Sequence, residues 1–247
     1  ADSVDLVVTS PPYTDLRAYH GFTFDFEATA KALYRVLKPV GVIVWIVGDK
    51  TDKGSEMGIP FQQALFFKSI GFKLHDTMIW TAARPPKTHR RYEQAFEYMF
   101  VFCKGDLKTF NPIMEKCKYA GKFNSKSTFR HSSDAERAEN KHTIAAIKDF
   151  RIKSNVWHIL SGRDGKTASE HPAIFPVKLV MDHIYSWSNA GDLVYDPFMG
   201  SGTTAVAAKM MGRRWIGSEI SSKYCEIIKR RLAETDESLP EVFSGLI

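Results

Sequence analysis

The residues best suited to chemistry near the start of the chain are Thr9-Ser10-Pro11-Pro12-Tyr13. Residues 4–8, just before them, are apolar and β-branched, which predicts a buried strand. Each proline fixes its own φ angle and lacks an N–H donor, and Pro11 also pushes Ser10 toward an extended conformation. We therefore expect a stiff turn at the carboxyl end of a strand, where open α/β sheets bind ligands. The alternative is a proline-capped strand end whose tyrosine belongs to the core.

A second candidate site is the glycine-rich run Gly200-Ser201-Gly202-Thr203-Thr204-Ala205, which fits the strand-to-helix turn G-x-G-x-x-A. Glu219 lies nineteen residues after Gly200, at the end of the next predicted strand. Glycines let the backbone approach a ligand, and a carboxylate accepts hydrogen bonds from ribose hydroxyls, so the pattern predicts a nucleoside site. No Gly-Lys-Ser/Thr follows, which argues against a phosphate-binding P-loop. The residues leave three interpretations open: a dinucleotide such as NAD, S-adenosylmethionine, or a helix start without a ligand.

The elements that must position these two sites alternate between strand and helix. This alternation predicts an α/β fold with a mostly parallel sheet covered on both faces. The helix at 27–38 is expected to end at Pro39 and Gly41, and Pro176 suits a first helical turn. The predicted strands are 4–8, 42–47, 72–80, 97–103, 193–195 and 215–217, and the predicted helices are 27–38, 60–69, one that starts at Pro176, one that ends near Gly212, and one that carries Tyr224, Ile227 and Ile228.

Length and composition fit one sizeable core with a smaller appended region. The chain has 247 residues, shows no signal peptide, and contains no apolar run near the ~20 residues of a membrane span, so we expect a cytoplasmic protein. Its three cysteines are widely spaced, which favours reduced thiols over a zinc site or a disulfide framework. The first residue is Ala1, almost inside a strand, which is compatible with sequence missing upstream.

The positive charge is concentrated in one central segment that interrupts the α/β pattern. Residues 104–166 hold fourteen Lys and Arg against seven Asp and Glu, whereas the remainder is nearly balanced although the whole chain carries +6. Such localisation is expected of a surface that binds a polyanion. The alternative is a solvated, lysine-rich loop region.

Three motifs together resemble the amino-methylating DNA methyltransferases. Residues 196–203, Asp-Pro-Phe-Met-Gly-Ser-Gly-Thr, are similar to their S-adenosylmethionine loop, and Ser10-Pro11-Pro12-Tyr13 matches their catalytic motif, (D/N/S)-P-P-(Y/F). His171-Pro172-Ala173-x-Phe175-Pro176 resembles the segment that precedes the cofactor loop. The order of the motifs is that of the β group, in which the target-recognition region separates the two halves. The resemblance covers nearly all of the chain except about 104–153.

The fold implied by this resemblance is a Rossmann-like methyltransferase sheet with helices on both faces and a basic target-recognition insert. We expect a catalytic half at 1–103, the insert at 104–153, and the cofactor-binding half at 154–247. Residues 155–157, Asn-Val-Trp, resemble the family's return to the core after the recognition region. Trp157 is therefore expected in the core rather than stacked on a base.

The resemblance implies transfer of a methyl group from S-adenosyl-L-methionine to the exocyclic amine of a flipped base. The catalytic residues would be Ser10, Pro11, Pro12 and Tyr13. The Ser10 hydroxyl and the Pro11 carbonyl would accept the two amine protons, so that the nitrogen lone pair localises, while Tyr13 stacks on the base. No metal is required for this chemistry.

For the cofactor, the resemblance implies that Glu219 takes the ribose hydroxyls and that the loop at 198–203 surrounds the methionine part. Asp196 either orients the backbone or meets the amino group, and His171 either contacts the carboxylate or caps the following helix. The family's Gly-Asp pair before the catalytic strand does not appear, and Asp49 ends a different strand. The cofactor-binding residues expected on this basis are Asp196, Phe198, Gly200, Ser201, Gly202, Thr203, Glu219 and His171.

The target base and the partners are less closely determined. The Ser-Pro-Pro-Tyr variant is associated mainly with N4-cytosine enzymes, so N4 of cytosine is favoured and N6 of adenine is the alternative. More distant alternatives are an RNA- or protein-directed methyltransferase, a non-catalytic DNA-binding module and an NAD-dependent oxidoreductase. The expected partner is double-stranded DNA, contacted by residues 84–91 and 104–166. A restriction endonuclease partner and a homodimer are both compatible with the sequence.

Overall fold

The computed structural model describes residues 1–12, 24–81, 92–122, 146–160 and 176–236. The chain divides into two compact units, one formed by Ala1–Asn111 with Asn155–Ile247 and the other by Pro112–Ser154. Tyr13, His171 and the predicted DNA-contact loop at 84–91 lie outside the described residues.

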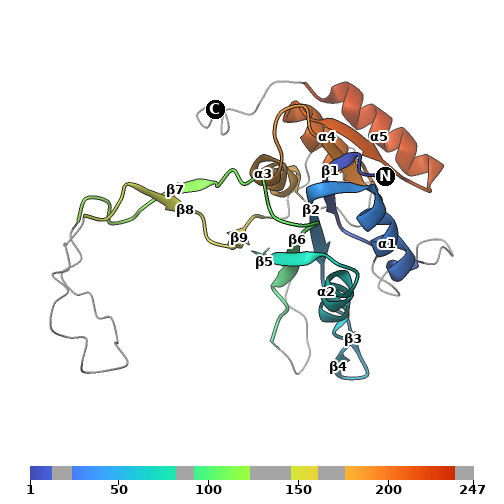
Figure 1. The fold of residues 1–247 in the computed structure, drawn as a ribbon, viewed down its shortest axis with the longest axis horizontal. Helices are drawn as coiled ribbons and strands as arrows, with labels where there is room; N and C mark the ends of the chain where they lie inside the picture. The colour runs from blue at the N-terminus through green and yellow to red at the C-terminus, as the bar shows by residue number, and fades with distance from the viewer. Residues whose placement is uncertain (13–23, 82–91, 123–145, 161–175, 237–247) are drawn as a thin grey trace. The chain divides into compact units, whose positions relative to one another are not determined.

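The first unit is built on a seven-stranded mixed sheet (Figure 1). Its strands are β1 (Val4–Thr9), β2 (Leu37–Val47), β5 (Lys73–Thr81), β6 (Phe96–Cys103), β9 (Val156–His158), β10 (Leu193–Asp196) and β11 (Arg214–Gly217). Their order across the sheet is β11-β10-β1-β2-β6-β5-β9. Four of the six pairings are parallel, as predicted, but β6 runs antiparallel to both β2 and β5.

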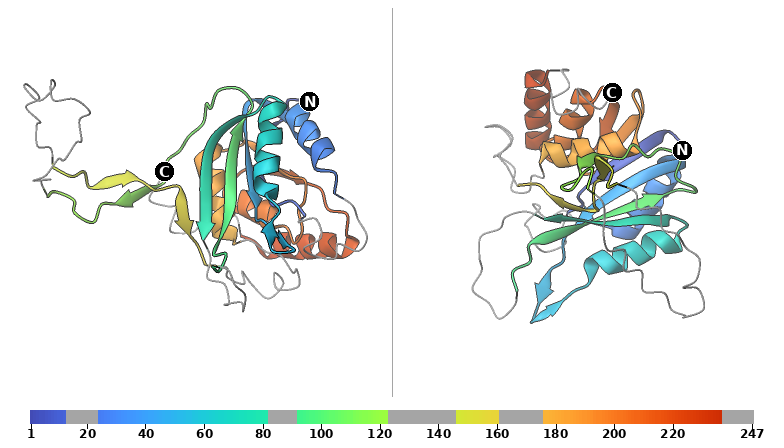
Figure 2. Two further views of the ribbon diagram at one scale, coloured as in Figure 1. Left: turned by 90° about the horizontal axis from the view of Figure 1, so that it is seen from below. Right: turned by 90° about the vertical axis from the view of Figure 1, so that its left-hand side faces the viewer.

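Helices cover both faces of this sheet, which confirms the predicted architecture. They are α1 (Phe26–Val36), α2 (Ile59–Ser69), α3 (Val177–Trp187), α4 (Thr203–Met210) and α5 (Ser222–Glu234). Helices α1 and α2 pack on one face, whereas α3 and α4 pack on the other, with α5 against α4 (Figure 2).

The predicted end of the first helix is wrong. Helix α1 starts where the Asp25 side chain accepts a hydrogen bond from the Ala28 N–H, but it ends at Val36, and β2 begins at Leu37. Leu37 is fully buried, so the chain turns into the sheet at once. Pro39 is tolerated in β2 because the ladder to β6 starts only at Val42, beyond the missing N–H.

The core between the sheet and α1 and α2 is strongly aromatic. Trp45, Phe67 and Phe102 are fully buried, with ring centroids 5.1 Å apart for Trp45–Phe67 and 4.7 Å for Phe67–Phe102. The Trp45 indole N–H donates to the Gln63 side-chain oxygen at 2.8 Å, so the buried donor is satisfied. On the other face, Trp157 is 4% exposed and stacks on His183, as expected of a core residue.

Asp49, which follows β2, has a structural role at the start of α2. A short hairpin of β3 (Thr51–Asp52) and β4 (Ser55–Glu56), which the sequence analysis does not predict, separates it from α2. Its carboxylate accepts the N–H groups of Gly58 at 3.0 Å and Ile59 at 3.2 Å, and so caps the start of α2.

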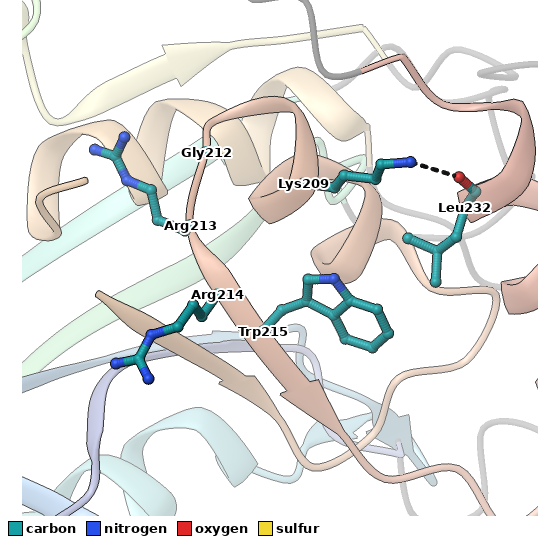
Figure 3. Close-up of a pocket in the computed structure, with 6 residues that line it drawn as sticks. All are labelled: Lys209, Gly212, Arg213, Arg214, Trp215 and Leu232. Carbon is teal, nitrogen blue, oxygen red and sulfur yellow. Dashed lines mark hydrogen bonds between the residues drawn. The ribbon is translucent and has the colours of Figure 1, made fainter. Parts of the chain in front are cut away.

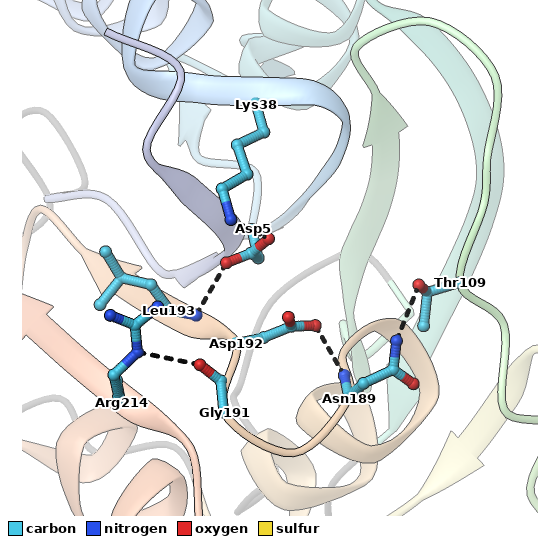
Figure 4. A network of polar contacts seen from close by, with 8 residues as sticks. All are labelled: Asp5, Lys38, Thr109, Asn189, Gly191, Asp192, Leu193 and Arg214. Atoms are coloured by element: carbon cyan, nitrogen blue, oxygen red, sulfur yellow. Dashed lines mark hydrogen bonds and ion pairs between the residues drawn. The ribbon is translucent and has the colours of Figure 1, made fainter.

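Polar contacts tie together the amino ends of the central strands (Figure 4). The Asp5 carboxylate accepts from Lys38 Nζ at 2.7 Å and from the Leu193 N–H at 2.9 Å, which joins β1, β2 and β10. Arg214 Nε donates to the Gly191 carbonyl at 2.9 Å and secures the start of β11. The strands are therefore fixed at the edge opposite their carboxyl ends.

The second unit contains an antiparallel hairpin of β7 (Met114–Lys116) and β8 (Phe150–Ile152). Arg151 and Glu115 form an ion pair of 2.6 Å across it. Lys118 and Lys122 both place their ammonium groups over the ring of Tyr119, 5.5 and 5.4 Å from its centroid. Tyr119 is half exposed, so this unit presents an aromatic ring flanked by two cations.

No helix within the described ranges has the length and apolar composition needed to cross a membrane. Cys103, Cys117 and Cys225 are all free thiols, as predicted. Burial raises the pKa of the Cys103 thiol to about 11, so this cysteine is held in its neutral form.

Candidate active site

The predicted catalytic turn and the predicted cofactor loop meet at one edge of the sheet. Strands β1 and β10 pair in parallel through Leu6–Val194 and Val7–Tyr195, so their carboxyl ends lie side by side. The Thr9 hydroxyl at the end of β1 donates to the Asp196 carboxylate at the end of β10, at 2.6 Å. Two motifs that are 187 residues apart in the sequence are thus in direct contact.

Asp196 is the centre of a buried polar network. Its Oδ1 accepts from the Thr9 hydroxyl and from the Phe198 N–H at 3.0 Å, and its Oδ2 accepts from the Thr204 hydroxyl at 2.7 Å. The residue is 1% exposed, and burial raises its pKa to about 6 although all three hydrogen bonds oppose this shift. Of the two roles considered for Asp196, the contacts favour the orientation of the surrounding chain.

The glycine loop needs glycine at Gly202 for two reasons. Its φ of +84° lies in the left-handed region, which side chains other than glycine rarely adopt. A Cβ there would also lie 2.9 Å from Cγ1 of Ile228 on α5. Gly202 directly precedes α4, and its N–H donates to the Met199 carbonyl at 2.8 Å, which closes the turn.

Glu219 holds this loop from the end of the neighbouring strand. Its Oε2 accepts the Gly200 N–H at 2.8 Å, and its Oε1 accepts the Ser221 N–H at 2.9 Å. A carboxylate offers about four lone-pair positions, so each oxygen retains acceptor capacity for a ligand hydroxyl. The half-buried Glu219 therefore fits the ribose-binding role, while it also fixes the loop backbone.

The loop is also fastened to β11. The Met199 N–H donates to the Ser218 carbonyl at 2.9 Å, and the Ser218 N–H donates to the Asp196 carbonyl at 3.0 Å. The Met199 side chain packs directly over Gly217, where an added Cβ would lie 1.7 Å from the Met199 Cε. Gly217 is thus required for this close approach.

Three residues outside the predicted set complete the site: Thr9, Thr204 and Arg231. Arg231 on α5 is 5% exposed, and its Nη1 donates to the Ser201 carbonyl at 2.7 Å, the Ser201 hydroxyl at 3.1 Å and the Thr203 hydroxyl at 3.2 Å. Thr9 and Thr204 lie within the two runs that the sequence pattern singles out, so their position is a usable signal although the pattern assigns them no role. No such signal marks Arg231 in the sequence, because it lies about thirty residues after the loop on an amphipathic helix.

The predicted catalytic residues that the structure describes follow directly from Thr9. Ser10 and Pro12 are half-buried, and Pro11 is buried. The Phe198 ring packs edge to face on the Phe24 ring, with centroids 5.1 Å apart. Phe24 is the first described residue after the Ser-Pro-Pro turn. The structure therefore brings Ser10, Pro11 and Pro12 to the edge that carries Asp196 and the loop.

Figure 3 shows a pocket on the first unit, and none of the residues that line it belongs to this site. The pocket is lined by Lys209, Gly212, Arg213, Arg214, Trp215 and Leu232. Arg214 pairs with Leu193, the first residue of β10, so the pocket sits at the amino end of the strands. In the part of the chain that the structure describes, no three His, Cys, Asp or Glu side chains group as a metal site.

Comparison with known proteins gives consistent matches over nearly the whole chain. The chain is 52% identical over 239 residues to the orphan methyltransferase M.BamHII of Bacillus amyloliquefaciens. This match covers 93% of this chain and 89% of that protein. The chain is 30% identical over 237 residues to the type II methyltransferase M1.MboII of Moraxella bovis, with 90% and 86% covered.

Solved structures share the fold. The PvuII DNA methyltransferase, described as cytosine-N4-specific, matches with a TM-score of 0.69 and 21% identity over 99% of this chain and 84% of that one. A putative DNA modification methylase of Thermus thermophilus, complexed with S-adenosyl-L-methionine, matches with a TM-score of 0.61 and 23% identity over 97% and 91%.

The family profile N6_N4_Mtase, described as DNA methylase, matches residues 4–230. This range includes both the Ser-Pro-Pro-Tyr turn and the glycine loop, and the predicted family is thereby confirmed. The chain belongs to the N6/N4 family of DNA methylases, as a β-group amino-methyltransferase.

Proposed function

We propose that this protein transfers a methyl group from S-adenosylmethionine to N4 of a cytosine flipped out of double-stranded DNA. The observation that carries the proposal is the hydrogen bond from the Thr9 hydroxyl to the Asp196 carboxylate. It joins the end of the strand that precedes Ser-Pro-Pro to the start of the glycine loop. It brings a turn suited to an amine next to a loop suited to a nucleoside. In β-group enzymes the two functions must share one edge of the sheet, because donor and acceptor react in direct contact.

The proposed cofactor site consists of Glu219 and of Phe198, Gly200, Ser201, Gly202 and Thr203 in the loop, with Asp196 as an organising residue. His171 is included on the resemblance of its motif. S-adenosylmethionine supplies an electrophilic methyl group on a sulfonium when it is bound. Glu219 fits the ribose because both of its oxygens retain acceptor capacity. The positive φ at Gly202 favours glycine, and because glycine has no side chain the loop backbone is open to close approach by a ligand.

At the catalytic turn, the Ser10 hydroxyl oxygen and the Pro11 carbonyl oxygen accept hydrogen bonds from the two N–H groups of the exocyclic amine. When the methyl group passes from the sulfonium to this nitrogen, a thioether is the leaving group and one of the two amine protons is lost to solvent. This amine is a weak nucleophile because its lone pair is delocalised into the base. Acceptors on both N–H groups favour a tetrahedral nitrogen with a localised lone pair, so no strong base is needed. Pro12 stiffens the turn, and Tyr13 stacks on the base, which contributes ~1–3 kcal/mol and offsets part of the unstacking cost of flipping.

Cytosine N4 is preferred over adenine N6 because serine, not aspartate, precedes the two prolines. The PvuII methyltransferase, which shares the fold, is described as cytosine-N4-specific, and this supports the choice. A hydroxyl and a carboxylate both accept hydrogen bonds, so the base is decided by experiment rather than by this residue.

DNA contact is assigned to the insert at 104–153, together with the basic residues up to 166 and the loop at 84–91. Lys118 and Lys122 beside Tyr119 offer two phosphate contacts and a stacking surface within the insert. The relatives include proteins described both as orphan and as type II methyltransferases. A restriction endonuclease partner and a homodimer therefore stay predictions.

The test is to incubate the purified protein with unmethylated DNA and S-adenosylmethionine and to identify the modified nucleoside by mass spectrometry. N4-methylcytosine is expected, and N6-methyladenine would reassign the base while it upholds the reaction. Cofactor binding without any methylation would indicate a non-catalytic DNA-binding module. A thermal shift with NAD and none with S-adenosylmethionine would contradict the cofactor assignment.

A further inference from the structure

We propose that Thr9 is a positioning residue for methyl transfer: through the Asp196 carboxylate, its hydroxyl fixes the Ser10-Pro11 turn relative to the cofactor loop. The inference rests on the proposed function and adds to it a residue that does not itself touch either substrate. It concerns the link between the two sites rather than either site alone.

The contacts converge on one carboxylate. Thr9 belongs to β1, Phe198 to the cofactor loop and Thr204 to the first turn of α4, and each donates one hydrogen bond to Asp196. Oδ1 receives both the Thr9 hydroxyl and the Phe198 N–H, so one atom joins the catalytic strand to the loop. Because a carboxylate is planar and rigid, movement of one donor is transmitted to the other.

Main-chain pairing does not make this link redundant. The residue pairs of the β1–β10 ladder are Leu6–Val194 and Val7–Tyr195, which lie two residues and more before Thr9. Beyond them, a contact of the Thr204 hydroxyl with the Val8 carbonyl is long, at 3.4 Å. Within the described residues, the 2.6 Å hydrogen bond from Thr9 to Asp196 joins β1 to the cofactor loop at the position directly before Ser10.

The environment of the link makes it strong and rigid. Thr9 is 0% exposed and Asp196 is 1% exposed, so water does not compete for the carboxylate. A buried charge requires donors, and a hydrogen bond to a charged acceptor is stronger than one between neutral groups. The same geometry has a titration signature, because the Thr9 hydrogen bond lowers the Asp196 pKa against the effect of burial.

The consequence belongs to the chemical step. Reacting atoms must approach to about 3–3.5 Å, and a displacement of about 1 Å can cost ~10²-fold in rate. Loss of the link should therefore lower kcat more than it changes the KM for either substrate, since both binding surfaces stay intact.

The experiment compares Thr9→Val with Thr9→Ser and with Thr204→Val, which removes a hydrogen bond of 2.7 Å to the other oxygen of the same carboxylate together with the 3.4 Å contact to the Val8 carbonyl. Thr9→Val should lower kcat by ~10- to 100-fold with little change in the KM for S-adenosylmethionine. The acidic limb of its kcat–pH profile should move to higher pH, because the Asp196 pKa rises. Thr9→Ser should restore kcat to within about 3-fold of wild type, and Thr204→Val should leave kcat well above that of Thr9→Val.

The inference is overturned if Thr9→Val retains kcat within about 3-fold of wild type, if Thr9→Ser is equally impaired, or if Thr9→Val and Thr204→Val behave alike. If Thr9→Val does not fold, Thr9→Ala against Thr9→Ser makes the same comparison. Amide hydrogen exchange at 198–202 separates this inference from the proposed function. The link predicts faster exchange in the variant without the hydroxyl, and equal rates would refute it even if wild type methylates no DNA.

Discussion

At the scale of single residues, two carboxylates at the same edge of the sheet have different tasks because their surroundings differ. Asp196 is buried and receives three hydrogen bonds from the protein, so its role is to hold the chain together. Glu219 is half-buried and, among the described residues, accepts one N–H on each oxygen, so it has acceptor capacity left for a ligand. Solvent access and the remaining acceptor capacity separate the structural acid, Asp196, from Glu219, which we propose as a ligand-binding acid.

The raised pKa of Asp196, about 6 against an ordinary 3.8, predicts a specific pH dependence of stability. Between these values the folded protein binds more protons at this residue than the unfolded chain does. The contribution of Asp196 to the free energy of unfolding therefore falls as pH rises from about 4 to about 6. The full change is on the order of 3 kcal/mol.

Asp196→Asn should remove this contribution and flatten the pH profile across that window. Urea unfolding of both proteins at several pH values from 4 to 7 measures the free energy of unfolding as a function of pH. The slopes of the two profiles are compared, because the amide also changes the hydrogen bonds and so shifts the absolute values. Glu226→Gln on the exposed face of α5 is the matched control and should keep the wild-type slope. Parallel profiles for wild type and Asp196→Asn would contradict the assignment.

At the scale of elements, the strand-to-helix turn depends on backbone shape. Gly202→Ala adds a Cβ at a φ of +84° and 2.9 Å from Ile228, so both backbone strain and a clash oppose it. We expect a loss of ~2–4 kcal/mol in the free energy of unfolding, together with weaker S-adenosylmethionine binding.

Gly191→Ala separates the two causes. Gly191 has a similar φ of +81°, but nothing lies within 4 Å of an added Cβ, so it should lose only the backbone part, about 1 kcal/mol. Chemical denaturation of both variants measures the difference. Equal losses would show that contact with α5 contributes nothing at Gly202.

Most elements could be predicted from hydrophobic pattern and from turn residues, and the exceptions have physical causes. The antiparallel direction of β6 is not visible at 97–103, because a buried apolar run reads alike in either direction. The early end of α1 is set by Leu37, whose burial in the sheet overrides helical periodicity. The motifs identified Ser10, Gly202 and Glu219 as candidates by residue type and spacing.

What the sequence does not show are contacts between side chains that lie far apart in the chain. Thr9 and Asp196 are separated by 187 residues, and nothing in a threonine signals its partner. Arg231 reaches the cofactor loop from α5, and its sequence context is that of an ordinary helix. Such links follow from the order of the strands in the sheet and become visible only in three dimensions.

At the scale of the whole molecule, the charge distribution predicts different tasks for the two units. The second unit, residues 112–154, holds ten Lys and Arg against five Asp and Glu, whereas the rest of the chain holds twenty-four against twenty-three. Affinity for DNA should therefore depend on salt through the insert, while cofactor binding should not.

Lys118→Ala and Lys122→Ala should each reduce the slope of log K against log[salt] by ~1 and leave S-adenosylmethionine binding unchanged. Fluorescence anisotropy with labelled duplex at several salt concentrations measures the slope. Lys31→Ala on α1, where the lysine pairs with Glu27, is the control and should keep it. An unchanged slope in both insert variants would remove these lysines from the DNA interface.

The central claim is that the Ser-Pro-Pro-Tyr turn methylates cytosine N4 in a defined DNA sequence. Its most direct test is methylation sequencing of genomic DNA from a methylation-free host that expresses either the wild-type protein or Ser10→Ala. The wild-type protein should leave N4-methylcytosine at one recurring motif, and the variant should leave little or none. N6-methyladenine at that motif, or equal modification by the variant, would contradict the account.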